Sequence, residues 1–264
     1  MTRPPPQIFD RRLYAQHRAR SDAAEFLVAD AAQNIAERIS AWSGAPQLAL
    51  DLSSRPASFA QLRDMAGMWI KSTPGCGLPS SAAVVADEEA IPFGPQSFHL
   101  ITSVLSLHAV NDLPGALIQI RHALKPGGLF VGALLGGETL SELRDSFAAA
   151  ESEVTGGITP RVAPFADVRD IGALLQRAGF MSPVSDVERT TVGYRDFFAL
   201  VSDLRTLGET NVMLQRSQQF LRRDVLRACL AHYQRSHSDQ ERRLRATFDV
   251  VYLTGWGPSE PIKD

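Results

Sequence analysis

The sequence is poor in cysteine and lysine, and it contains no long apolar run. Its 264 residues hold two cysteines, Cys76 and Cys229, far apart in the chain. They can build neither a disulfide framework nor a CxxC-type zinc site, so a reducing, cytoplasmic setting is expected. No apolar run approaches the ~20 residues of a transmembrane helix. The first ten residues lack the apolar stretch of a secretory signal, so we expect no such signal.

Almost all basic residues of this chain are arginines, whereas most proteins use a mixture of lysine and arginine. The chain has 27 basic residues, of which three are lysines, and 29 acidic residues, for a net charge of −2. This balance argues against bulk nucleic-acid binding. Arginines nevertheless gather within residues 1–20 and 216–245. Two interpretations stay open. The arginines form solvated helix faces, or they form a basic surface. Such a surface would bind an acidic protein partner, or it would bind anionic lipids and hold the protein peripherally at the inner membrane.

Short apolar runs alternate with amphipathic segments along most of the chain. The predicted strands are 47–52, 67–71, 82–86, 97–104, 129–135, 184–192 and 246–256. The predicted helices are 8–20, 22–42, 59–65, 113–124, 139–153, 168–178, 197–207 and 218–234. This order predicts an α/β fold with a mostly parallel seven-stranded sheet and helices on both faces. We expect an N-terminal helical extension over 1–43 and one domain over 44–264, with a helical insertion at about 194–240.

From Leu48 onward, the order of signals resembles that of the class I methyltransferases, Rossmann-like enzymes that use S-adenosylmethionine (SAM). The Leu-Lys-Pro-Gly-Gly-Leu turn at 124–129 most suggests this, because its glycines permit a tight turn into a buried strand. Further segments narrow the resemblance: Ile8–Arg11, Ala86–Phe93, Leu105–Asp112, Gly136–Leu140 and Arg177–Phe180. They resemble the mitochondrial complex I assembly factor family, which has a methyltransferase fold and a reported arginine hydroxylase role. They also resemble its bacterial relatives, which are labelled as malonyl-carrier methyltransferases of biotin synthesis.

The resemblance implies a site at the carboxyl ends of the strands, where such sheets bind ligands. It also implies SAM as the cofactor and a respiratory complex I subunit as the protein partner. The expected cofactor-binding residues are Asp51, Ser53, Asp87, Glu88 and Ser106. His108 and Asn111 are the expected catalytic residues on the substrate side. A histidine there can act as a general base near neutral pH, or it can be a polar residue at the rim of a pocket.

The loop after the first strand departs from the methyltransferase pattern. SAM enzymes carry glycines there, which let the backbone approach the cofactor, whereas this chain reads Ser-Ser-Arg-Pro-Ala over 53–57. Ser54 and Arg55 are expected to enter the space of the methionine moiety. The second strand also lacks the acid that accepts the ribose hydroxyls, a loss of roughly 1.5–3 kcal/mol, or about 10- to 100-fold in affinity. A third departure is His99, where the family usually has aspartate.

These departures leave several functions open. For the cofactor there are two alternatives: SAM binding is lost, or a rearranged loop still holds SAM through Asp51, Asp87 and backbone groups. For the function there are three. The chain is a methyltransferase or an arginine hydroxylase, or a non-catalytic assembly protein (a pseudoenzyme), or a methyltransferase for an acyl carrier or small molecule. No metal site is expected, because the three histidines considered, His17, His99 and His122, lack ligand spacing with other metal-binding residues.

Overall fold

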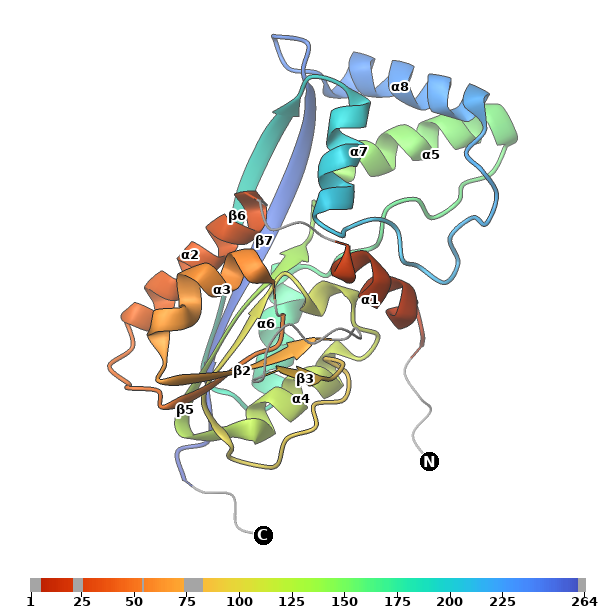
Figure 1. Cartoon of the computed structure of the whole chain (residues 1–264). Coiled ribbons are helices and arrows are strands. Elements are labelled where there is room, and N and C mark those ends of the chain that lie inside the picture. The colour runs from red at the N-terminus through yellow and green to blue at the C-terminus, as the bar shows by residue number, and fades with distance from the viewer. Residues whose placement is uncertain (1–5, 21–25, 54, 74–82, 261–264) are drawn as a thin grey trace.

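The computed structural model describes residues 6–20, 26–53, 55–73 and 83–260, which form a seven-stranded sheet with helices on both faces (Figure 1). The strands are β1 (Leu48–Asp51), β2 (Met68–Thr73), β3 (Ala83–Val85), β4 (Phe98–Val104), β5 (Leu124–Gly136), β6 (Met181–Tyr194) and β7 (Leu244–Trp256). Their order is β3-β2-β1-β4-β5-β7-β6, and β7 runs antiparallel to both of its neighbours. The predicted fold class is confirmed. Ser54 and Cys76 fall outside the described residues.

Two apolar cores lie on opposite faces of the sheet. One core holds α2 (Phe26–Ser40) and side chains from α3 (Pro56–Leu62), together with a layer made by α5 (Ser141–Thr155), α7 (Phe197–Thr206) and α8 (Arg223–His237). The other core holds α4 (Leu113–Ala123) and α6 (Val168–Arg177). The long strands β6 and β7 extend beyond the parallel part of the sheet and carry α7 and α8 near their far end (Figure 1). Among the described residues, no helix combines the length and apolarity of a membrane span.

Several helices begin later or earlier than the sequence predicts. The helix α1 (Arg11–Ala19) starts after Asp10, whose carboxylate accepts a hydrogen bond from the Leu13 N–H at 3.0 Å and caps the helix. Helix α3 starts at Pro56 because proline fits the first helical turn, where its missing N–H has no partner to lose. Two short 3₁₀ turns, η1 (Arg63–Met65) and η2 (Leu107–Ala109), complete the connections.

The glycine turn at 124–129 is an irregularity inside β5. The register between β4 and β5 shifts there, from Phe98 opposite Leu124 to Leu100 opposite Leu129. Gly127 has φ +68°, and a Cβ on Gly128 would lie 2.9 Å from the Lys125 carbonyl oxygen. Both positions therefore need glycine, one for its conformation and one for close packing.

Candidate functional site

Asp51 ends β1 with a buried carboxylate at the carboxyl edge of the parallel strands. Its Oδ1 accepts hydrogen bonds from the Ser53 backbone N–H at 3.0 Å and from the Ser53 hydroxyl at 2.6 Å. An aspartate that accepts donors two residues ahead closes a tight local turn. Two of the predicted cofactor residues therefore bind each other directly.

Arg55 follows the same turn and runs back across the strand ends. Its side chain is 4% exposed, and its guanidinium donates to Leu207 O at 2.9 Å, Leu105 O at 3.0 Å and Glu209 Oε1 at 2.8 Å. Leu105 directly follows β4 and has φ 49°, which is uncommon for a residue with a side chain. The guanidinium thus joins the loop after β1 to the end of β4 and to the connection between α7 and α8.

The second strand presents a cation and lacks the acid that the resemblance implies near its end. Lys71 stands in register with Asp51. Its ammonium lies 3.3 Å from the centre of the Phe59 ring, a cation–π contact. Phe59 in turn packs edge-on against Trp69, with ring centres 5.9 Å apart. These contacts place the Phe59 ring beside β2.

Asp87 and Glu88 follow β3, and both pair with Arg11 of α1. Arg11 Nε and an NH2 group donate to the two Asp87 oxygens at 3.1 and 2.8 Å, and the NH2 group also contacts Glu88. Glu88 is buried, and Arg11 also donates to Ala109 O at 2.8 Å. Burial lowers the pKa of Arg11, but the charge of Glu88 and the hydrogen bond to Asp87 outweigh it and raise that pKa. Arg11 therefore stays a cation against the two acids.

Two more side chains of α1 reach the strand ends. Arg18 donates to Ser53 O at 2.8 Å, and the Tyr14 hydroxyl donates to Ser106 O at 3.3 Å. The Arg11 guanidinium lies over the Tyr14 ring at 4.6 Å. Burial raises the pKa of Tyr14, so its phenol keeps the donated proton. Helix α1 thus contacts residues that follow β1, β3 and β4, and it covers this edge of the sheet (Figure 1).

Ser106 and His108 follow β4, as predicted. The buried Ser106 hydroxyl lies 2.8 Å from that of Ser103. His108 accepts a hydrogen bond from the Leu135 N–H at Nδ1, at 3.4 Å, so its Nε2 carries the proton and donates to Glu209 Oε2 at 2.8 Å. Both ring nitrogens have protein partners. Glu209 therefore holds His108 and Arg55 with its two oxygens.

Asn111 lies beside the segment that precedes α1. Its Oδ1 accepts hydrogen bonds from the N–H groups of Ile8 and Phe9, both at 2.7 Å, and its Nδ2 donates to Phe9 O at 3.2 Å. The amide thus anchors the chain where it enters α1. Its role in catalysis stays a prediction.

A cavity of about 160 Å³ lies next to His108 and Glu209. Its walls are mostly apolar. They include Phe9, Leu135, Leu140, Phe165, Val201, Leu204 and Phe248, with Arg161 among the polar groups. His108 therefore borders a small apolar space.

The structure has Asp51, Asp87, Ser106 and His108 at or after the ends of strands, where the sequence predicts them, but the sequence does not predict their partners Arg11 and Glu209. Arg11 lies in a family-like segment, but nothing in the sequence pairs it with Asp87. Glu209 lies in the irregular connection after α7, where no periodic pattern exists to read. His99 lies at the opposite end of β4, where its Nδ1 accepts from the Leu48 N–H at 3.4 Å.

Comparisons with known proteins agree with this architecture. A family model described as a methyltransferase domain matches residues 41–132. The human mitochondrial protein named arginine-hydroxylase NDUFAF5 is 37% identical over 266 residues, which covers 94% of this chain and 76% of that protein. A malonyl-[acyl-carrier protein] O-methyltransferase from a Methylovorus species is 31% identical over 272 residues, which covers 96% of this chain and 89% of the relative.

A solved structure shares the fold at much lower identity. The protein YcgJ from Bacillus subtilis superposes with a TM-score of 0.58 and 11% identity, over 86% of this chain and 98% of that one. At this identity, the likeness concerns the fold alone.

Proposed function

The chain belongs to the methyltransferase-fold family that includes the mitochondrial arginine-hydroxylases NDUFAF5 and the malonyl-carrier O-methyltransferases, and from this premise we propose that it acts by binding a protein partner and not by transferring a methyl group from SAM. The observation that carries the proposal is the position of Arg11 and Arg55. Arg11 pairs with Asp87 and Glu88, two residues that the family resemblance assigns to the cofactor. Arg55 follows the loop after β1 and donates to Leu105 O, next to Ser106.

The residues at the strand ends do not fit SAM. Asp87 is the acid expected beside the adenine amine, and it is paired with Arg11. Arg55 lies at the loop expected to take the methionine moiety, and β2 (Met68–Thr73) has no acid to hold the ribose. An adenine amine that binds Asp87 would have to displace the Arg11 guanidinium from it, which costs binding free energy. The missing ribose acid adds to this cost.

Isothermal titration calorimetry of the full chain with SAM and with S-adenosylhomocysteine tests the cofactor part. We expect no saturable heat and no thermal shift at about millimolar ligand. The double variant Arg11→Ala/Arg55→Gly is the matched comparison, because it frees Asp87 and removes the buried guanidinium. We expect this variant to gain measurable binding. Micromolar binding by the unaltered chain would overturn the proposal.

The partner that we propose is a subunit of respiratory complex I, met at the inner membrane. Arg11 is turned inward, with only 13% of its side chain exposed. Exposed arginines can meet a partner instead, and they include Arg223, Arg227 and Arg235 of α8. Arg223 and Arg227 are one helical turn apart and share a face. An acidic surface of the partner would complement this face.

Affinity purification from the native cell tests the partner part. We expect the chain to recover a complex I subunit, and the triple variant Arg223→Glu/Arg227→Glu/Arg235→Glu to lose it. Failure to recover any complex I subunit above an untagged control would contradict the proposal. Mass spectrometry of the same samples tests the hydroxylase activity that is named for the relatives. A hydroxylated arginine of the partner would carry the added mass of one oxygen, and this added mass should be absent in a deletion strain.

A second candidate is methyl transfer to an acyl carrier. Its support is the 31% identity with a malonyl-carrier methyltransferase over nearly the whole chain, together with arginines that suit an acidic carrier. This candidate requires SAM, so the calorimetry above separates the two. It also predicts that a deletion strain fails to grow without biotin.

A further inference from the structure

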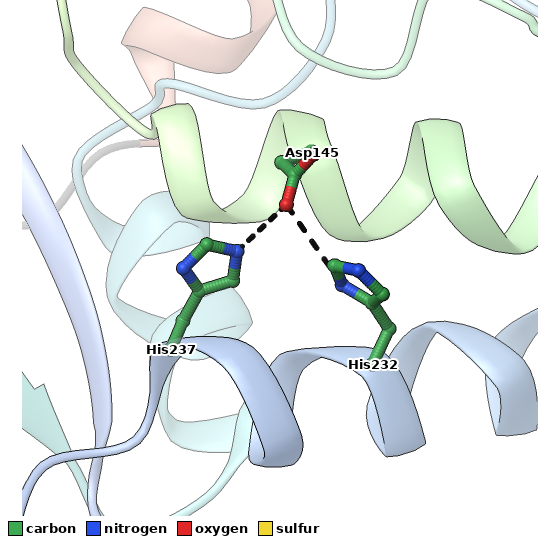
Figure 2. Close-up of side chains that lie close together, drawn as sticks. All are labelled: Asp145, His232 and His237. Atoms are coloured by element: carbon green, nitrogen blue, oxygen red, sulfur yellow. Dashed lines mark hydrogen bonds and ion pairs between the residues drawn. The ribbon is translucent and has the colours of Figure 1, made fainter.

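Two histidines of α8 and one aspartate of α5 converge at the surface, outside the site at the strand ends (Figure 2). His237 Nε2 lies 2.8 Å from Asp145 Oδ2, and His232 Nδ1 lies 3.9 Å from the same oxygen. One nitrogen from each ring and one carboxylate oxygen all lie within 4.8 Å of one another. Figure 2 shows both rings pointing from α8 toward the carboxylate on α5.

The packing of the two helices brings these groups together. Helices α5 and α8 lie side by side (Figure 1) and share one apolar core, to which Phe147 and Tyr233 belong. The buried Tyr233 ring meets His237 edge-on, with ring centres 5.7 Å apart. The His232 Nδ1 also lies 3.3 Å from the buried Ser146 hydroxyl. Both imidazoles are therefore held in place by neighbours that belong to the core.

We propose that Asp145, His232 and His237 form a binding site for a divalent first-row transition metal ion, with Zn²⁺ as the expected occupant. Imidazole nitrogens and a carboxylate oxygen are ligands that Zn²⁺ takes at about 2.0–2.2 Å. In a tetrahedral site, such ligand atoms are about 3.3 Å apart. The two separations from Asp145 Oδ2, 2.8 and 3.9 Å, lie on either side of this value. Small side-chain rotations are enough to form the site.

Access and charge also suit a cation. The Asp145 side chain is 59% exposed, and the two histidines are each about one fifth exposed. An ion can therefore enter from solvent, and water can fill its remaining position. His237 is the last residue of α8, so the partial negative charge of the helix C-terminus adds to that of Asp145. The ion would fasten the helix after β5 to the helix before β7.

The simpler alternative is that His237 and Asp145 form only a hydrogen bond between two helices. Titration of the untagged full chain with ZnCl₂ separates the two cases. We expect one ion per chain with micromolar affinity, and Co²⁺ in its place should show the visible absorption of a tetrahedral site. Mg²⁺, which prefers oxygen ligands and octahedral geometry, should not compete.

Single variants define the ligands. His232→Ala, His237→Ala and Asp145→Asn should each weaken Zn²⁺ binding by at least about tenfold. The control is His122→Ala, which removes an exposed histidine from α4 and should keep the unaltered affinity within about twofold. Circular dichroism confirms that each variant is folded.

Melting curves with Zn²⁺ and with a chelator give a second readout. The metal site predicts that Zn²⁺ raises the melting temperature of the unaltered chain and that this rise is absent in the three ligand variants. A hydrogen bond alone predicts equal losses with and without Zn²⁺. That result, or a failure to saturate at about 1 mM Zn²⁺, would overturn the proposal.

Discussion

Replacing Arg55 by methionine should destabilise the fold by about 3 kcal/mol. The guanidinium makes three hydrogen bonds, and the side chain of its partner Glu209 is 11% exposed. Removing one member of a buried ion pair costs about 3–5 kcal/mol, because the remaining charge stays buried without compensation. Glu209 keeps its contact with His108 at 2.8 Å, so the lower end of this range is expected. For a chain of this size, the melting temperature should fall by roughly 6–12 °C.

Chemical denaturation of a double-mutant cycle measures this interaction. The cycle uses Arg55→Met, Glu209→Gln and the double variant, and it should give a coupling energy of about 1–3 kcal/mol. The matched control is Arg63→Met, because Arg63 is 66% exposed in its pair with Asp64. Exposed pairs are worth about 0–1 kcal/mol, so the control should barely change stability. Equal effects of Arg55→Met and Arg63→Met, or a coupling below about 0.5 kcal/mol, would refute the structural role assigned to Arg55.

Three other perturbations test separate parts of the molecule. Asn111→Ala should speed hydrogen exchange of the two backbone amides that its side chain holds by roughly 10- to 100-fold, as expected for lost hydrogen bonds of about 1.5–3 kcal/mol. Burial raises the pKa of Asp249, but the hydrogen bond from Arg189 outweighs burial, and the pKa ends below its ordinary value. Its stabilisation is therefore present above about pH 4 and lost as the pH falls through the folded pKa, and Arg189→Ala should flatten this acid dependence in denaturation curves. Burial raises the pKa of the Cys229 thiol to about 12, so in a Cys76→Ser variant a thiol reagent should react only after unfolding.

Hydrophobic patterning predicts the sheet because it is a local property of the chain. The strands of the parallel sheet are short apolar runs, and a helix separates β1 from β2 and β4 from β5. The boundaries follow less well, because they depend on contacts between a few atoms. The Asp10 cap, which starts α1 three residues after the predicted position, is one such contact. The antiparallel direction of β7 cannot be predicted from its own residues, because it depends on the topology of the whole sheet.

The candidate site shows where sequence reasoning ends. Position after a strand is enough to place Asp51, Asp87 and His108 at one edge of the sheet, because parallel strands end there together. What those groups bind is decided by residues distant in the chain. Arg11 reaches Asp87 across 76 positions, and Glu209 reaches His108 across 101. No local pattern carries such pairings. The same holds for the α5–α8 cluster, since His232 and His237 are five residues apart and share no regular helical face.

The unusual use of arginine in this chain has a physical reason at the strand ends. Arg11, Arg18 and Arg55 each donate to acceptors on at least two separate segments, among them backbone carbonyls that follow β1 and β4. A guanidinium has five N–H donors in a planar fork, whereas a lysine ammonium is a compact and strongly hydrated point charge. Lysine at these positions could not join two segments with the same geometry. Arg55→Lys should therefore lose most of the coupling with Glu209 even though it keeps the charge, which distinguishes a hydrogen-bonded bridge from simple charge neutralisation.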